Sequence, residues 1–111
     1  MLGQEPMILS PLRPNIGKTG TLKVPPDGKI LRFKIVDEIR RAQSDLPEKI
    51  ICLQRIEFDD GREQFRLGYY IIGKLPKMKG KWVWGQFATL LPPKDFVAIL
   101  RKAAKRDWFQ I

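Results

Sequence analysis

The chain has 111 residues, of which 43% are hydrophobic, and this predicts one domain with a single core. It has no histidine and one cysteine, Cys52, which excludes an internal disulfide and a Cys/His zinc site and removes the commonest general base. Its apolar runs are too short to span a bilayer and residues 1–10 do not resemble a signal peptide, so we expect a cytoplasmic protein without a membrane partner.

The net charge of +9 is unevenly distributed. Residues 1–36 carry +4, residues 37–63 carry −3 and residues 64–111 carry +8. Positive charge that gathers in one part of the chain predicts a basic face, and a basic face is typical of proteins that bind a polyanion.

Residues 1–28 contain five of the nine prolines and four of the nine glycines. This composition predicts an irregular arm, with one short strand at Thr19–Val24, ahead of a single α+β domain at 29–111. Gly17-Lys18-Thr19 resembles the end of a phosphate-binding loop. We reject that motif because position 12 is leucine where the motif needs glycine, and no strand precedes it.

Residues 28–36 alternate apolar and basic side chains, which predicts a half-buried strand with a positive outer face. Arg32 and Lys34 on that outer face are candidate nucleic-acid-binding residues. One or two helical turns are expected to follow at residues 37–44.

Residues 50–72 predict a β-hairpin. Asp60-Gly61 favours a two-residue type I′ turn. That turn pairs Ile56 with Phe65 and Cys52 with Tyr69.

The same register places Arg55 directly opposite Arg66. Like charges in that position are destabilising. Two explanations remain open: Glu57 neutralises the pair, or a phosphate lies between the two guanidinium groups. Both arginines are therefore candidate binding residues.

Four lysines within eight residues carry the strongest functional signal: Lys74, Lys77, Lys79 and Lys81. Interspersed Gly and Pro predict a loop. Trp82 and Trp84 follow in a strand and share one face. Lysines beside aromatic rings suit nucleic acid, because cations hold phosphates and rings stack on bases. The alternative is a solvated loop followed by two core tryptophans.

The strand that contains these tryptophans is predicted to run to Leu91, with Val83 and Phe87 on its other face. Pro92-Pro93 then opens an amphipathic helix. Its apolar face is formed by Phe96, Ile99, Leu100 and Ala103. Trp108 and Phe109 are expected to fold back against the sheet.

No constellation for catalysis is found. Asp59 and Asp60 are explained by the turn, and no other carboxylates cluster as a metal-dependent nuclease requires. We therefore expect no enzyme activity, no metal and no cofactor.

The sequence thus predicts an α+β fold: a mostly antiparallel, curved sheet of four to five strands with a C-terminal helix on one face. The element order and the strand-to-helix junction at 89–96 resemble small single-stranded-nucleic-acid-binding proteins of the transcriptional-coactivator and PUR type. The resemblance implies a homodimer. The predicted function is non-enzymatic binding of single-stranded or distorted DNA or RNA. The alternative is an accessory, protein-interaction subunit with a basic surface.

Overall fold

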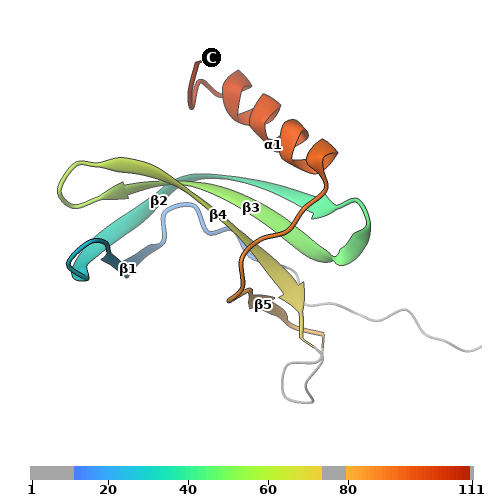
Figure 1. Ribbon diagram of the computed structural model, residues 1–111, viewed down its shortest axis with the longest axis horizontal. Helices are drawn as coiled ribbons and strands as arrows, with labels where there is room; N and C mark the ends of the chain where they lie inside the picture. The colour runs from blue at the N-terminus through green and yellow to red at the C-terminus, as the bar shows by residue number, and fades with distance from the viewer. Residues whose placement is uncertain (1–11, 74–79, 111) are drawn as a thin grey trace, which may run out of the picture.

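The computed structural model describes residues 12–73 and 80–110 (Figure 1). The elements, in chain order, are β1 (Thr19–Val24), β2 (Lys29–Gln43), β3 (Leu46–Phe58), β4 (Glu63–Ile72), β5 (Trp82–Trp84) and α1 (Pro93–Lys105). The strands form one antiparallel sheet in the order β1-β2-β3-β4-β5. The predicted fold class is therefore confirmed.

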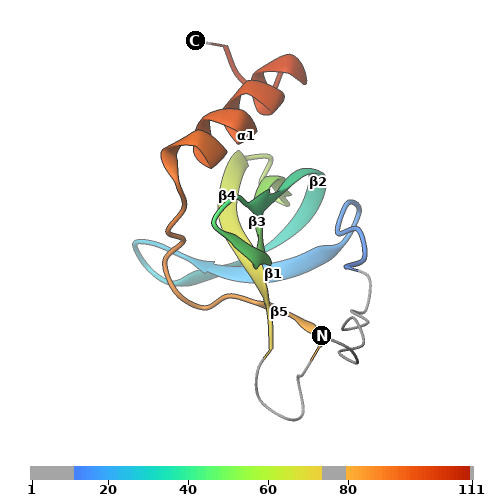
Figure 2. The same ribbon diagram turned by 90° about the vertical axis from the view of Figure 1, so that its right-hand side faces the viewer.

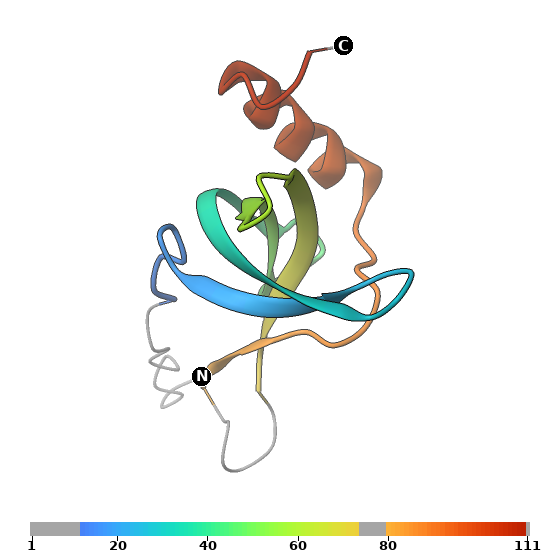
Figure 3. The same ribbon diagram turned by 90° about the vertical axis from the view of Figure 1, so that its left-hand side faces the viewer.

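The sheet is curled into a half-barrel (Figures 2 and 3). Helix α1 covers one face, which we call the helix face, and the edge strands β1 and β5 curve away from it. The opposite face, on the inside of the curl, is called the concave face. Within the described residues, no helix has the length and apolar character needed to cross a membrane.

A bulge in β2 allows this strand to contribute apolar side chains to both faces of the sheet. Leu31, Phe33 and Ile35 point to the concave face, and the register with β3 then shifts between Ile35 and Asp37. Because side chains alternate along a strand, this one extra residue turns Ile39 to the helix face. The predicted helical turns at 37–44 are wrong: β2 continues to Gln43, since its pairing with β3 outweighs local preference.

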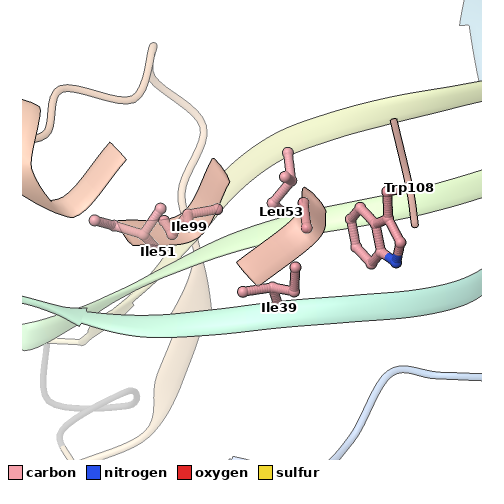
Figure 4. Close-up of a cluster of buried hydrophobic side chains, with 6 residues drawn as sticks. Ile39, Ile51, Leu53, Ile99 and Trp108 are labelled. Atoms are coloured by element: carbon pink, nitrogen blue, oxygen red, sulfur yellow. The ribbon is translucent and has the colours of Figure 1, made fainter. Parts of the chain in front are cut away.

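Each face has its own apolar core. The helix-face core, drawn in Figure 4, consists of Ile39, Ile51, Leu53, Ile99, Ala103 and Trp108. The concave-face core consists of Leu31, Phe33, Ile35, Ile56 and Phe58, with Leu22 and Val24 of β1 against it. The prediction that Trp108 folds back against the sheet is confirmed, since its ring lies 5.5 Å from that of Phe65 on β4.

The β3–β4 hairpin is present, but its turn has three residues instead of two. The Phe58 N–H donates to the Arg62 carbonyl (2.8 Å), and the Gly61 N–H donates to the Phe58 carbonyl (2.9 Å). Gly61 has a φ of 88°, as expected for a turn that ends in a left-handed residue. The extra loop residue moves the register by one from the predicted pairing.

This shift separates the two arginines that were predicted to face each other. Arg55 lies opposite Phe65, and Arg66 lies opposite Gln54. Since neighbouring strand residues point to opposite faces, Arg55 is on the helix face and Arg66 is on the concave face. The predicted like-charge pair is therefore wrong.

Strand β5 is much shorter than the predicted strand from Trp82 to Leu91. After Trp84 the chain leaves the sheet at Gly85, whose N–H still donates to the Tyr69 carbonyl (2.8 Å). Phe87, which was predicted to lie in this strand on the same face as Val83, is instead outside the strand and 84% exposed. The irregular segment that follows carries the chain across to α1 (Figure 1).

The start of α1 is fastened to the turn between β2 and β3 by Asp95. This fully buried carboxylate accepts hydrogen bonds from Arg41 Nε (2.7 Å), Ser44 N (3.0 Å) and Ser44 Oγ (3.0 Å). The bonds from Ser44 N and Arg41 lower the pKa of Asp95, because they stabilise its ionised form. The helix is thus held by a charged clamp as well as by its apolar face.

Candidate ligand-binding cleft

The concave face carries a cleft of about 250 Å³. Its lining comes from β1 and the residues before it, and from all four other strands. The lining residues are Asn15, Lys18, Thr19, Phe33, Ile35, Gln54, Arg66, Tyr70 and Trp84. The sheet curls so that its two edges approach each other (Figure 3), and residues from both edge strands line the same cleft.

Arg66 is the central charged group of the cleft. Its guanidinium carbon lies 4.9 Å from the centre of the Phe33 ring and 5.2 Å from that of Trp84. These distances are within the range of cation–π attraction. Its Nε also donates to Gln54 Oε1 at 2.9 Å, so three side chains fix the position of the guanidinium group.

No carboxylate forms an ion pair with Arg66 in the described part of the chain. Burial against the aromatic rings lowers the pKa of Arg66 from its ordinary value, because desolvation disfavours the charged form. The two terminal nitrogens have no hydrogen-bond partner among the described residues, yet they are not sealed from solvent. Arg66 therefore presents unused donors to the cleft.

Trp84 forms one wall of the cleft and is held rigidly. Its ring packs edge-on against Tyr70, with 4.9 Å between the centroids. It also lies directly on the backbone of Gly68, where a Cβ atom would collide with the indole ring. A glycine at this position is what allows the indole to lie so close to β4.

A network of polar side chains centred on the buried Glu38 includes three residues that line the cleft, Asn15, Gln54 and Tyr70. Glu38 accepts hydrogen bonds from Asn15 Nδ2 (3.1 Å), Gln54 Nε2 (2.6 Å) and Arg40 Nε (2.6 Å). Asn15 Nδ2 also donates to the Tyr70 hydroxyl (2.9 Å). Gln54 is therefore oriented by Glu38 on one side and orients Arg66 on the other.

The segment before β1 is anchored as a second wall. Arg40 donates to the carbonyls of Leu12 (3.1 Å) and Arg13 (2.6 Å). The Ile35 N–H donates to the Lys18 carbonyl (2.9 Å), and the Gly17 N–H donates to the Ile35 carbonyl (2.7 Å). These bonds hold Asn15 and Lys18 beside the cleft.

Of the predicted site residues, the structure brings together Arg66 and Trp84. Trp82 lies in the same strand as Trp84, half-buried and opposite Ile72. Lys81 is exposed, and its carbonyl accepts the Gly73 N–H at 2.9 Å. The predicted loop lysines Lys74, Lys77 and Lys79 lie outside the described residues.

The remaining predicted site residues lie on the other face. Arg55 makes two hydrogen bonds to Glu63, at 2.8 and 3.0 Å, and this pairing raises the pKa of Arg55. Arg32 and Lys34 are exposed and alternate with the concave-face core residues of β2. Lys34 lies directly opposite Glu57. These three cations do not share a surface with Arg66.

Sequence reasoning did not identify Asn15, Lys18, Gln54 and Tyr70 as site residues. Asn15 and Lys18 lie in a segment whose composition predicts irregular structure. The curl of the sheet brings them close to β4, and no short sequence pattern indicates that curl. The hairpin register could have revealed Gln54 as the neighbour of Arg66, had the three-residue turn been recognised from Gly61.

Elsewhere in the described residues, neither Cys52 nor the carboxylates have the features of a reactive site. Burial raises the pKa of Cys52 to about 12, so its thiol is un-ionised at neutral pH. The described residues bring together no set of His, Cys, Asp or Glu side chains that could hold a metal ion. The cleft around Arg66 is thus the best-supported candidate site.

No protein-family model, curated protein or solved structure matches the chain. None of these comparisons supports the resemblance drawn from the element order. The fold defines a small α+β half-barrel, and its function is inferred from the cleft.

Proposed function

We propose that this protein binds nucleic acid without catalysis and takes single-stranded or distorted DNA or RNA into the concave face. One observation carries the proposal: Arg66 is a partly desolvated cation, held by Phe33 and Trp84, without a carboxylate partner in the described residues. The longer-range attraction of Glu38 compensates only part of this desolvation, and an anionic or electron-rich ligand in direct contact would offset the rest.

Nucleic acid is the ligand class that best fits the surroundings of Arg66. Proteins that bind single strands combine a positively charged groove with aromatic side chains, and this cleft contains Lys18 and Arg66 beside three aromatic rings. The net charge of +9 adds a long-range attraction to a polyanion. An unpaired strand can reach into a concave face of this size more readily than a regular duplex.

The test compares two arginines on neighbouring strands that point to opposite faces. Arg66→Gln should weaken the binding of a labelled single-stranded oligonucleotide by about tenfold or more, since it removes a pre-organised cation from the cleft. Arg55→Gln removes the same charge from the helix face and should change the affinity by less than about threefold. Fluorescence anisotropy over a series of salt concentrations measures both effects.

Two results would contradict the proposal. One is the absence of saturable, salt-dependent binding to DNA or RNA by the folded wild-type protein. The other is an equal loss of affinity in the two variants, which would mean that only net charge matters. Circular dichroism of both variants checks that each is folded.

A second candidate is a protein-interaction subunit, or a homodimer, that uses the segment between β5 and α1. Phe87 and Leu90 in this segment are 84% and 79% exposed, and a surface of this kind is typical of an interface. Sedimentation of the wild type and of Phe87→Ser distinguishes the two forms. A concentration-dependent dimer that the substitution dissociates supports the homodimer, and a wild-type monomer at all concentrations argues against it.

A further inference from the structure

Resting on the proposed function, we infer that the cleft selects one unpaired guanine, and that Arg66 reads its base edge. The observation behind this inference is the state of the guanidinium group. Nε is occupied by Gln54, whereas both terminal nitrogens are without a partner in the described residues. Those two nitrogens form a planar pair of donors, and such a pair matches two adjacent acceptors on a ligand.

The lining of the cleft fits a base better than a phosphate. Phe33, Ile35 and Trp84 offer apolar surface, and Asn15, Thr19 and Tyr70 are polar but neutral. Lys18 is the second cation in the lining. Sites for flat organic ligands have this composition, with apolar walls and a few placed polar groups, whereas phosphate sites gather several cations and backbone N–H groups.

Guanine is the base whose exposed edge best matches Arg66. Its O6 and N7 are adjacent acceptors, and their bidentate pairing with arginine is the commonest specific contact between proteins and DNA bases. Adenine presents a donor, N6, beside its N7, and this donor would face an N–H group. Cytosine also has two adjacent acceptors, O2 and N3, but its O2 lies beside the sugar, which the walls of the cleft would have to admit.

The rigidity of Arg66 makes this recognition selective. Arginine side chains ordinarily lose rotamer freedom when they bind, and that loss weakens discrimination. Here the two rings, together with Gln54 held by Glu38, fix the guanidinium group before any ligand arrives. The orientation of the donor pair is therefore built into the folded protein.

The experiment uses the full chain and ten-residue oligo-dT strands with one central replacement. The replacements are guanine, adenine, cytosine and 7-deazaguanine, in which the N7 acceptor is absent. We expect the guanine strand to bind about five- to a hundredfold more tightly than the adenine strand. The 7-deazaguanine strand should lose most of this advantage, since one of its two hydrogen bonds cannot form.

Arg66→Lys serves as the matched variant because it keeps the charge and loses the planar donor pair. It should retain the salt dependence of binding and bind the four strands with affinities within about threefold of one another. The 7-deazaguanine comparison uses the wild-type protein, so the test does not depend on whether this variant folds.

The outcomes separate the two proposals. Salt-dependent binding with equal affinity for all strands, or a preference for cytosine, would overturn the guanine assignment and leave nucleic-acid binding standing. Failure to bind any of these strands, or an RNA strand of the same length with one central guanine, at low salt would overturn the proposed function itself. If Arg66→Lys still binds the guanine strand selectively, another residue recognises the base.

Discussion

The two arginines of the β3–β4 hairpin, Arg55 and Arg66, differ in the groups that surround their side chains. Arg55 is half-buried and meets a carboxylate, Glu63, so its charge is satisfied within the fold. Arg66 is half-buried among aromatic rings and bonds to the neutral Gln54. A single residue of register, set by the length of the turn, decides which of the two is available to a ligand.

Gly68 is the residue on which the geometry of the cleft depends most. A methyl group in Gly68→Ala would collide with the indole of Trp84, so the ring would have to move away from Tyr70 and Arg66. We expect a stability loss of about 1–3 kcal/mol, as is typical of overpacking, together with weaker oligonucleotide binding. Urea unfolding and fluorescence anisotropy measure the two effects.

Gly85→Ala is the matched control, because its methyl group would collide with Tyr69 on the helix face. It should be destabilised to a similar extent while keeping its affinity for oligonucleotides. If Gly68→Ala is as stable as the wild type and binds equally well, the close packing of Trp84 on β4 is not what shapes the cleft.

At the scale of elements, the position of α1 depends on the Asp95 clamp. Asp95→Asn removes the ion pair with Arg41 and weakens both bonds to Ser44. The variant should melt at least about 5 °C below the wild type at pH 7. Thermal unfolding followed by circular dichroism measures the difference.

The same clamp predicts a pH dependence. The pKa of Asp95 is lower in the folded chain than in the unfolded chain, so its ionised form stabilises the fold above the ordinary aspartate pKa near 4. That contribution is lost as the pH falls toward the folded-state pKa. Wild-type stability should therefore fall more steeply between pH 5 and pH 3 than that of Asp95→Asn. Asp59→Asn, at an exposed turn position, is the control, and its stability should depend on pH as that of the wild type does. If the stability of all three proteins changes with pH in the same way, ionised Asp95 does not stabilise the fold.

At the scale of the whole molecule, secondary structure could be predicted from the sequence where it depends on residues that are close together in the chain. The hairpin around Gly61 and the helical spacing of Ile99 and Ala103 each fix an element within a few residues, whereas the alternation at residues 28–36 gives the start of β2 but not its continuation to Gln43. The extent of β5 was not predictable, because it ends where Gly85 packs against Tyr69 from a distant part of the chain.

The candidate site was predictable only in part, for the same reason. Trp84 was identified from its aromatic ring beside the lysines, and Arg66 was identified from a predicted pairing with Arg55 that the structure does not contain. Their proximity depends on the register of β4 and β5, and the addition of Asn15 depends on the curl of the entire sheet. No short stretch of sequence determines the curl of the sheet or the register between distant strands.

The extra residue of the β2 bulge is Val36, and it restricts which mutations the gene for this protein can accumulate. Replacing Val36 leaves the side-chain alternation of β2 intact, so many missense alleles are expected to be tolerated at this codon. Losing the codon would restore regular alternation and turn either Phe33 or Ile39, each with its neighbours, toward the wrong core. Descendants of this chain should therefore preserve the number of residues between Ile35 and Asp37 more strictly than the identity of the residue that stands there.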